Sequence, residues 1–370
     1  MSELPCKLKS VTLGPLKVAP ATSFGSPFPG PSYNQPLSLP LRPPHVKDNG
    51  EACINFGQDP VPNLKRLGYC IVRKVFSRAE CHATISAIWN WLESLGTGID
   101  RNVPETWSDD KWPSNINEGM IQHSLGYKPF MWYIREHPNM IELFRQIYQT
   151  RELMVSLDGA SIVRPGKTGS PISWLHTDQN PTKSSPDLIY GNPECSVQGI
   201  ANFEMCGDDD ASLLVGKGSH MLHPEVFKRN GKNPENNWYR LDKDDLDFLT
   251  EKGVEWVKLN PEEGSVILFL STVWHSGKAH KEQQINHTES LTVATAGRFR
   301  YVTYVSYAPA SRATPEDLEI KARAVREGKL TTHWGSNNVR IFPSQIPNEE
   351  HIDYENWSDF RKQLVGLIPY

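Results

Sequence analysis

The sequence has 370 residues, of which 22% are charged and 38% are hydrophobic, and its formal net charge is −4. This balance offers no basic face for nucleic acid, and no apolar segment approaches the roughly 18 residues that a membrane span needs. The six cysteines form no C-x-x-C pair, so we expect a reduced, cytoplasmic protein with one large core and appendages. Nothing in the composition indicates an oligomeric state.

The first third of the chain combines an irregular arm with two helices. Residues 1–62 hold 12 of the 29 prolines, which predicts an arm rather than a domain. The stretch Leu67–Val75 is typical of an edge strand. Ser77, with Glu80 three residues later, forms a capping-box pattern that predicts the start of a helix. A second helix is predicted over Pro138–Tyr148, where apolar residues recur at helical spacing.

Short strands dominate the middle of the chain. They are separated by Gly, Pro, Asn and Asp, and no helix alternates with them as in a parallel β/α sheet. This pattern predicts a mainly β fold with flanking helices, whose core is an antiparallel jelly roll, the double-stranded β-helix. The seven strand candidates are Leu153–Val163, Ile172–Asp178, Cys195–Met205, Ala211–Val215, Val254–Leu259, Ser265–Leu270 and Arg298–Tyr307.

The chain divides into three predicted parts. After the arm, residues 63–310 form the core domain, which is interrupted by a charged, lid-like insert at residues 221–252. Residues 311–370 return to helix, for which Thr314 is the expected N-cap, and end in a tail that wraps the core.

One pair of side chains stands out as a candidate metal site. His-x-Asp/Glu occurs five times, which is more than the one or two expected by chance, so spacing alone selects none of them. Only His176 and Asp178 follow a Pro-Gly turn within a predicted strand, whose pleat points both side chains to one face. An imidazole and a carboxylate on one face suit Fe(II), once a second histidine joins them. The other pairs are His223/Glu225, His280/Glu282, His287/Glu289 and His351/Asp353.

The second histidine must come from another strand. His275 ends a buried apolar run that begins at Gly264, which makes it the best candidate, although a hydrogen-bonded core histidine explains it equally well. The next strand begins with Arg298 and Arg300 on one face, where a planar guanidinium can bind a carboxylate through two parallel hydrogen bonds.

These features resemble the phytanoyl-CoA dioxygenase family of Fe(II)- and 2-oxoglutarate-dependent oxygenases. V-R-P-G at 163–166 resembles the family's basic-Pro-Gly turn, and W-L-H-T-D-Q at 174–179 resembles its H-x-D-Q segment. D-D-A-S-L-L-V-G-K-G-S-H at 209–220 is similar to the family's segment ending in G-S-H. F-R-Y-V-T-Y-V-S-Y-A at 299–308 resembles its final strand. The resemblance covers about residues 65–310 and implies an oxygenase that uses Fe(II), 2-oxoglutarate and O2 on a small organic substrate.

The resemblance also implies roles for individual residues. His176, Asp178 and His275 would hold the iron, and Arg300, with Arg298 as the second choice, would bind the distal carboxylate of 2-oxoglutarate. Because 25 residues separate His275 from Arg300, against about a dozen in the family, residues 276–297 are interpreted as an insert.

Two amides are further candidates for binding the co-substrate or the substrate. Gln198 and Asn202 fall on one face of the strand that follows His-x-Asp, where the barrel interior is expected, although both also suit structural hydrogen bonds. Two other functions stay open at this point. A jelly-roll binding protein without oxygen chemistry would keep the fold, and a cupin-like metal enzyme would need the triad but no carboxylate-binding arginine.

Overall fold

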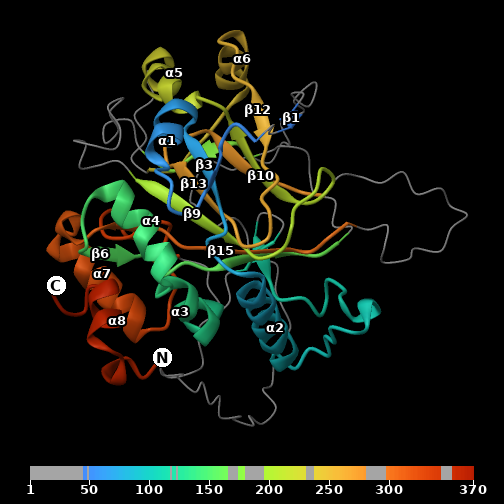
Figure 1. Ribbon diagram of the computed structural model, residues 1–370, viewed down its shortest axis with the longest axis vertical. Coiled ribbons are helices and arrows are strands. Elements are labelled where there is room, and N and C mark those ends of the chain that lie inside the picture. Colours follow the sequence, from blue (N-terminus) through green and yellow to red (C-terminus); the bar gives the residue numbers. More distant parts are fainter. Residues whose placement is uncertain are drawn as a thin grey trace, which may run out of the picture.

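The computed structural model describes residues 45–47, 50–116, 119–121, 124–165, 174–179, 196–230, 237–280, 297–342 and 352–370 (Figure 1). Two large sheets form its centre, and side chains from both sheets line one cavity between them. The predicted fold, mainly β with flanking helices and a jelly-roll core, is confirmed. The domain boundaries at residues 62 and 310 stay predictions.

The larger sheet has eight strands and carries much of the apolar core. Neighbouring strands in it are antiparallel, except for the parallel pair β2·β3. The stretch predicted as an edge strand, β3, is therefore internal, because residues from the end of the predicted arm pair with it along its outer side. The order is β2 (Cys53–Asn55), β3 (Tyr69–Arg73), β13 (Val266–Leu270), β9 (Val197–Asn202), β15 (Arg300–Tyr304), β7 (Ala160–Val163), β5 (Met120–Ile121) and β4 (Asn115–Ile116).

The smaller sheet has six strands and carries the His-x-Asp pair. Its order is β1 (His45–Lys47), β12 (Trp256–Lys258), β10 (Ser212–Gly216), β14 (His275–Lys278), β8 (His176–Thr177) and β11 (Tyr239–Arg240). A separate two-stranded sheet joins β16 (Tyr307–Pro309) to β6 (Leu153–Val155).

Helices flank the sheets in two groups (Figure 1). The helices α3, α4, α7 and α8 gather on one side of the sheets, whereas α5 and α6 lie together at one end of the molecule. The capping box predicted at Ser77 with Glu80 is present, and the predicted N-cap Thr314 also forms a capping box, with Asp317. The helices are α1 (Val61–Leu67), α2 (Arg78–Ser94), α3 (Pro129–Arg135), α4 (Pro138–Tyr148), α5 (His223–Asn230), α6 (Lys243–Glu251), α7 (Pro315–Arg326) and α8 (Asp359–Leu364).

Several predicted strands are shorter or divided. The Leu153–Val163 candidate splits into β6 and β7, because Asp158 leaves the ladder: its backbone carbonyl accepts a 2.7 Å hydrogen bond from Arg135. The Ile172–Asp178 candidate contains only the two residues of β8, and residues 172–173 lie outside the described part. Most of the expected insert at 276–297 also lies outside it. Among the described helices, none combines the length and the apolar character required to cross a membrane.

Candidate active site

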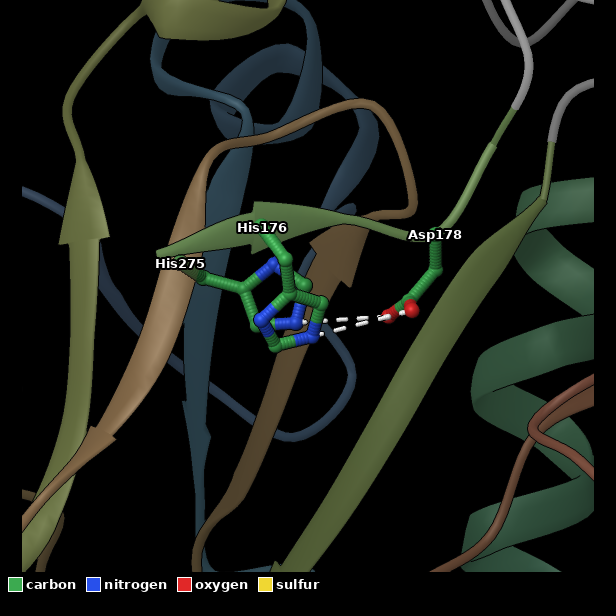
Figure 2. A group of neighbouring side chains, drawn as sticks. All are labelled: His176, Asp178 and His275. Carbon is green, nitrogen blue, oxygen red and sulfur yellow. Dashed lines mark ion pairs between the residues drawn. The ribbon is translucent and has the colours of Figure 1, made fainter. Parts of the chain in front are cut away.

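The three candidate metal ligands lie together between the sheets (Figure 2). His176 comes from β8, Asp178 follows that strand directly, and His275 begins β14 as the cross-strand partner of His176. The Nε2 atoms of His176 and His275 lie 3.6 and 3.3 Å from the Asp178 carboxylate oxygens. All three side chains are buried, and their ligand atoms lie within 4.8 Å of one another. Among the described residues, no other group of three such side chains converges in this way.

Backbone carbonyls fix the orientation of both imidazole rings. The Nδ1 atom of His176 lies 2.9 Å from the carbonyl oxygen of Trp174, and that of His275 lies 2.9 Å from the carbonyl oxygen of Val273. A carbonyl only accepts hydrogen bonds, so each Nδ1 carries a proton, which leaves Nε2 as the ring nitrogen that can bind a metal. The indole of Trp174 stacks on the ring of His176 with an interplanar angle of 14°. Both rings are therefore prepared to bind a metal through Nε2.

The Asp178 carboxylate is held ionised and in place. Burial alone would raise the pKa of Asp178, but the charges and hydrogen bonds of His176 and His275 outweigh burial and keep this pKa well below its usual value. Gln198 on β9 donates a 2.8 Å hydrogen bond from Nε2 to Asp178 Oδ2, and its amide also lies 3.2 Å from Ser271 Oγ. Two imidazoles and one ionised carboxylate on one side of a cavity match the donor set that binds Fe(II) and leaves positions open.

Arg300 lies in the same cavity as the triad, on the opposite wall. It is only 9% exposed, and its Nη1 donates to Ser161 Oγ at 3.4 Å. The Tyr304 side chain lines the cavity beside them, and burial raises the pKa of its hydroxyl. Among the described residues no carboxylate pairs with Arg300, so its buried charge is available to an anionic ligand. The cavity is lined by Met120, Ser161, Trp174, His176, Gln198, Ile200, Leu213, Phe269, His275, Gly277, Arg300, Tyr304 and His333.

Two of the residues singled out in the sequence lie outside this cavity. Arg298 is 48% exposed and bonds to Asp210 through both its backbone N–H and its guanidinium. The Asn202 amide donates to the carbonyls of Glu204 and Glu262 at 2.7 and 3.1 Å, which closes a turn at the end of β9. Gln198 and Arg300 are thus brought to the triad, whereas Asn202 and Arg298 are not.

The cavity also contains a residue that no pattern in the sequence selects. His333 belongs to an irregular segment after α7, and its Nδ1 is hydrogen-bonded to the buried carboxylate of Asp158. The segment has no strand periodicity and no recognisable motif around His333, so only the folded chain reveals its position.

A wider groove lies elsewhere on the molecule, at the start of α2 and along α3. Its volume is about 850 Å³, and Glu80, Tyr133 and His137 are among the side chains that line it. None of the three candidate ligands lines this groove. The buried cavity between the sheets is therefore the better candidate for the reaction site, although it is much smaller.

A jelly-roll core with an inward-facing His-x-Asp pair and a distal histidine defines the class of non-haem metal enzymes that hold Fe(II) on one side. The family model for phytanoyl-CoA dioxygenase matches residues 64–288. The chain belongs to the phytanoyl-CoA dioxygenase family. It is accordingly a non-haem iron dioxygenase that uses Fe(II) and 2-oxoglutarate.

Two relatives are similar over most of their length. "Ava biosynthesis cluster protein O" of Aspergillus versicolor is 24% identical over 278 residues, which cover 72% of this chain and 83% of that protein. A Dictyostelium discoideum protein whose description names phytanoyl-CoA dioxygenase is 22% identical over 278 residues, covering 66% of this chain and 78% of that protein.

The fold is similar to that of a solved structure. A crystal structure of an oxidoreductase from Salmonella typhimurium LT2 has a TM-score of 0.55 at 11% identity, covering 85% of this chain and 86% of that one. EctD from S. alaskensis, crystallised with 2-oxoglutarate and 5-hydroxyectoine, has a TM-score of 0.44 at 15% identity, covering 79% and 84%.

Proposed function

We propose that this dioxygenase oxidises an unactivated C–H bond of a small organic substrate, normally by hydroxylation, with release of succinate and CO2. His176, Asp178 and His275 hold the iron. The observation that carries the proposal is the convergence of two imidazole Nε2 atoms and one carboxylate beside a cavity that also contains Arg300, which pairs with no carboxylate in the described part of the chain.

Arg300 is the residue that we assign to the distal carboxylate of 2-oxoglutarate. Its guanidinium is buried, inward-facing and, within the described residues, hydrogen-bonded to the Ser161 hydroxyl, whereas Arg298 already has a carboxylate partner in Asp210. A dianionic co-substrate, one arginine, one aspartate and a divalent metal together carry no net charge. Burial of the complex therefore leaves no isolated charge in the low-dielectric interior.

The chain's own residues position the reactants and exclude water. When bound, iron and 2-oxoglutarate supply, with O2, the oxidising power that removes hydrogen from a C–H bond. Gln198 holds the Asp178 carboxylate at a fixed angle, and the carbonyls of Trp174 and Val273 hold the two imidazoles. Apolar walls such as Phe269 and Leu213 keep the cavity dry. Because Asp178 occupies the carboxylate position, no ligand position is freed for halide, and we favour hydroxylation over halogenation.

The two other functions considered for this sequence receive less support. A binding protein without oxygen chemistry would be favoured if both arginines pointed outward, but Arg300 is inward and buried. A cupin-like metal enzyme would not need Arg300 in the cavity. Ring formation, desaturation and epoxidation use the same metal and co-substrate, so the nature of the substrate decides between them and hydroxylation.

One experiment tests the proposal directly. The purified protein is loaded with Fe(II) without oxygen, and 2-oxoglutarate is titrated in while the weak visible charge-transfer band is recorded. Oxygen is then admitted and succinate is measured, first alone and then with a panel of small organic compounds. We expect the band, slow succinate formation without substrate, and faster formation with a compound that is oxidised. A metal-loaded protein that shows neither the band nor succinate would contradict the proposal.

A further inference from the structure

His333 occupies a place in the cavity that the iron and co-substrate assignments do not explain. It comes from a segment beyond residue 288, where the match to the family model ends. Its side chain is 18% exposed, whereas that of its partner Asp158 is 2% exposed. His333 lines the same cavity as His176, His275 and Arg300.

The His333 ring is held from several directions. Nδ1 bonds to Asp158 Oδ2, while Asp158 Oδ1 accepts a 2.7 Å hydrogen bond from the backbone N–H of Gly159. The ring packs on Tyr304 and Phe342, with centroid distances of 5.5 and 6.5 Å. No hydrogen bond to Nε2 is found among the described residues, so this atom is the one polar atom of the side chain that remains available.

Several hydrogen bonds hold the backbone around His333 in place. The Thr331 N–H donates to the Leu157 carbonyl at 2.8 Å, and the Leu157 N–H donates to Thr331 Oγ1 at 3.0 Å. The fully buried Lys321 ammonium donates to the carbonyls of Val155 and Gly335 at 2.6 Å each. A side chain at Gly335 would meet backbone atoms at 2.6 Å. His333 is thus presented to the cavity by a well-fixed backbone.

The register of the large sheet places His333 at the metal end of the cavity. Tyr304 on β15 pairs with Ile200 on β9, and Gln198, which contacts Asp178, lies two residues further in the same direction. Arg300 lies at the opposite end of β15, about 13 Å from Tyr304 along the strand. Because His333 packs on Tyr304 and lines the cavity with His176 and His275, it lies at the end that holds the metal ligands, although the Arg300 guanidinium also reaches back along β15 to Ser161. The substrate's reacting carbon must also lie at this end.

We propose that His333 orients the oxidised substrate by donating a hydrogen bond from Nε2–H to a substrate oxygen, and that Asp158 is the positioning residue that holds it. This inference rests on the proposed function, because it assumes that the oxidised compound lies beside the metal. The Asp158–His333 pair carries no net charge, so it suits a neutral acceptor such as a carbonyl, hydroxyl or ether oxygen. Burial would lower the pKa of His333, but the charge and hydrogen bond of Asp158, together with the charge of Asp178, outweigh it and raise this pKa to about 9, which keeps Nε2 protonated at neutral pH.

Two variants test the role of Nε2–H. His333→Phe keeps a planar ring without a donor, and His333→Gln keeps a side-chain N–H. In the first arm, 2-oxoglutarate is titrated into each Fe(II)-loaded protein without oxygen, and its Kd is read from the visible band. We expect values within about twofold of wild type, since Arg300 makes the charge-assisted bonds. A rise of about tenfold or more in His333→Phe would place His333 on the co-substrate and overturn the proposal.

The second arm measures the affinity of oxygen-containing small molecules. Compounds that bind the wild-type protein in the presence of Fe(II) and 2-oxoglutarate, without O2, are each compared with an analogue that lacks the oxygen. We expect His333→Phe to weaken binding of the oxygen-containing compound by about fivefold or more, and to leave the analogue unchanged. His333→Gln should retain part of the affinity. Equal losses for both compounds, or no loss, would overturn the proposal.

Two features keep these outcomes interpretable. Melting temperatures of the variants show whether each protein is folded before its affinities are compared. The second arm measures binding and not turnover, so it decides the role of His333 even if the wild-type protein forms no succinate. The failure of this inference is therefore distinguishable from the failure of the proposed function.

Discussion

Gln198 donates a 2.8 Å hydrogen bond to Asp178, which precedes it by 20 residues and directly follows β8. The bond joins β9 of the large sheet to the end of β8 in the small sheet. Because Asp178 Oδ2 accepts this hydrogen bond, the carboxylate cannot rotate freely, and the direction in which it can bind a metal is fixed. This hydrogen bond therefore links the two sheets directly beside the candidate metal site.

Replacement of Gln198 by Leu should weaken metal binding without abolishing it. The substitution keeps the approximate size of the side chain but removes the donor, so Asp178 becomes free to rotate. We expect the Kd for Fe(II) to rise by about 10- to 100-fold, as is usual when a partner of a ligand is lost. Competition with a chelator measures this Kd. Asn202→Ala is the matched control, because Asn202 lies on the same strand but outside the cavity. A similar rise in both variants would show that the effect is not local.

Removal of any one of the three ligands should abolish stable Fe(II) binding. In wild type, we expect bound Fe(II) to raise the melting temperature, because the metal binds the folded state more tightly than the unfolded state. We expect this rise to vanish in His176→Ala, Asp178→Ala and His275→Ala, together with succinate formation. His82→Ala serves as the control, since His82 is an exposed histidine that pairs with Glu263. If Fe(II) still raises the melting temperature of one of these variants, the residue replaced in it is not an iron ligand.

Substitution of Arg300 should weaken the binding of 2-oxoglutarate, whereas substitution of Arg298 should not. We expect Arg300→Ala to raise the Kd of 2-oxoglutarate by about 10- to 100-fold, which corresponds to the loss of charge-assisted hydrogen bonds. Arg300→Lys should recover part of this loss, because it restores the charge but not the paired geometry. Arg298→Ala should leave the Kd within about threefold of wild type. Titration of the visible band measures all three, and a larger effect at Arg298 would reverse the assignment.

The sequence contains enough local information to find part of this site. The capping boxes at Ser77 and Thr314 depend on residues three positions apart, and both are present. The face shared by His176 and Asp178 also follows from neighbouring residues, and an apolar run that ends in His275 is readable as a buried strand.

Contacts between residues far apart in the chain could not be predicted from the sequence. Arg298 and Arg300 share one strand face by parity, but Asp210, 88 residues away, binds Arg298 before the strand begins. Likewise, Asp158 is hydrogen-bonded to His333, which lies 175 residues later in the chain. No periodicity encodes such pairings, because they depend on how the sheets and the C-terminal segment come together.

The Asp158–His333 ion pair should also make folding stability depend on pH in a defined direction. The pKa of His333 rises from 6.5 to about 9 on folding, because Asp158 outweighs the opposing effect of burial. Below pH 6.5 the folded and unfolded states both carry the proton, so the stabilisation is fully present. It is lost as the pH rises through 9, where the folded state releases the proton. We expect wild type to exceed His333→Gln in free energy of unfolding by about 1 to 3 kcal/mol at pH 6.

Urea unfolding at pH 6, 7.5 and 9.5, with a chelator present to remove metal linkage, measures this difference. The difference should shrink steadily between the first and the last pH value. His82→Gln provides the control, since its side chain is 60% exposed and its pairing with Glu263 is screened by solvent, so its effect should stay near zero throughout. A difference between wild type and His333→Gln that is constant or grows with pH would mean that Asp158 does not hold His333 as a cation.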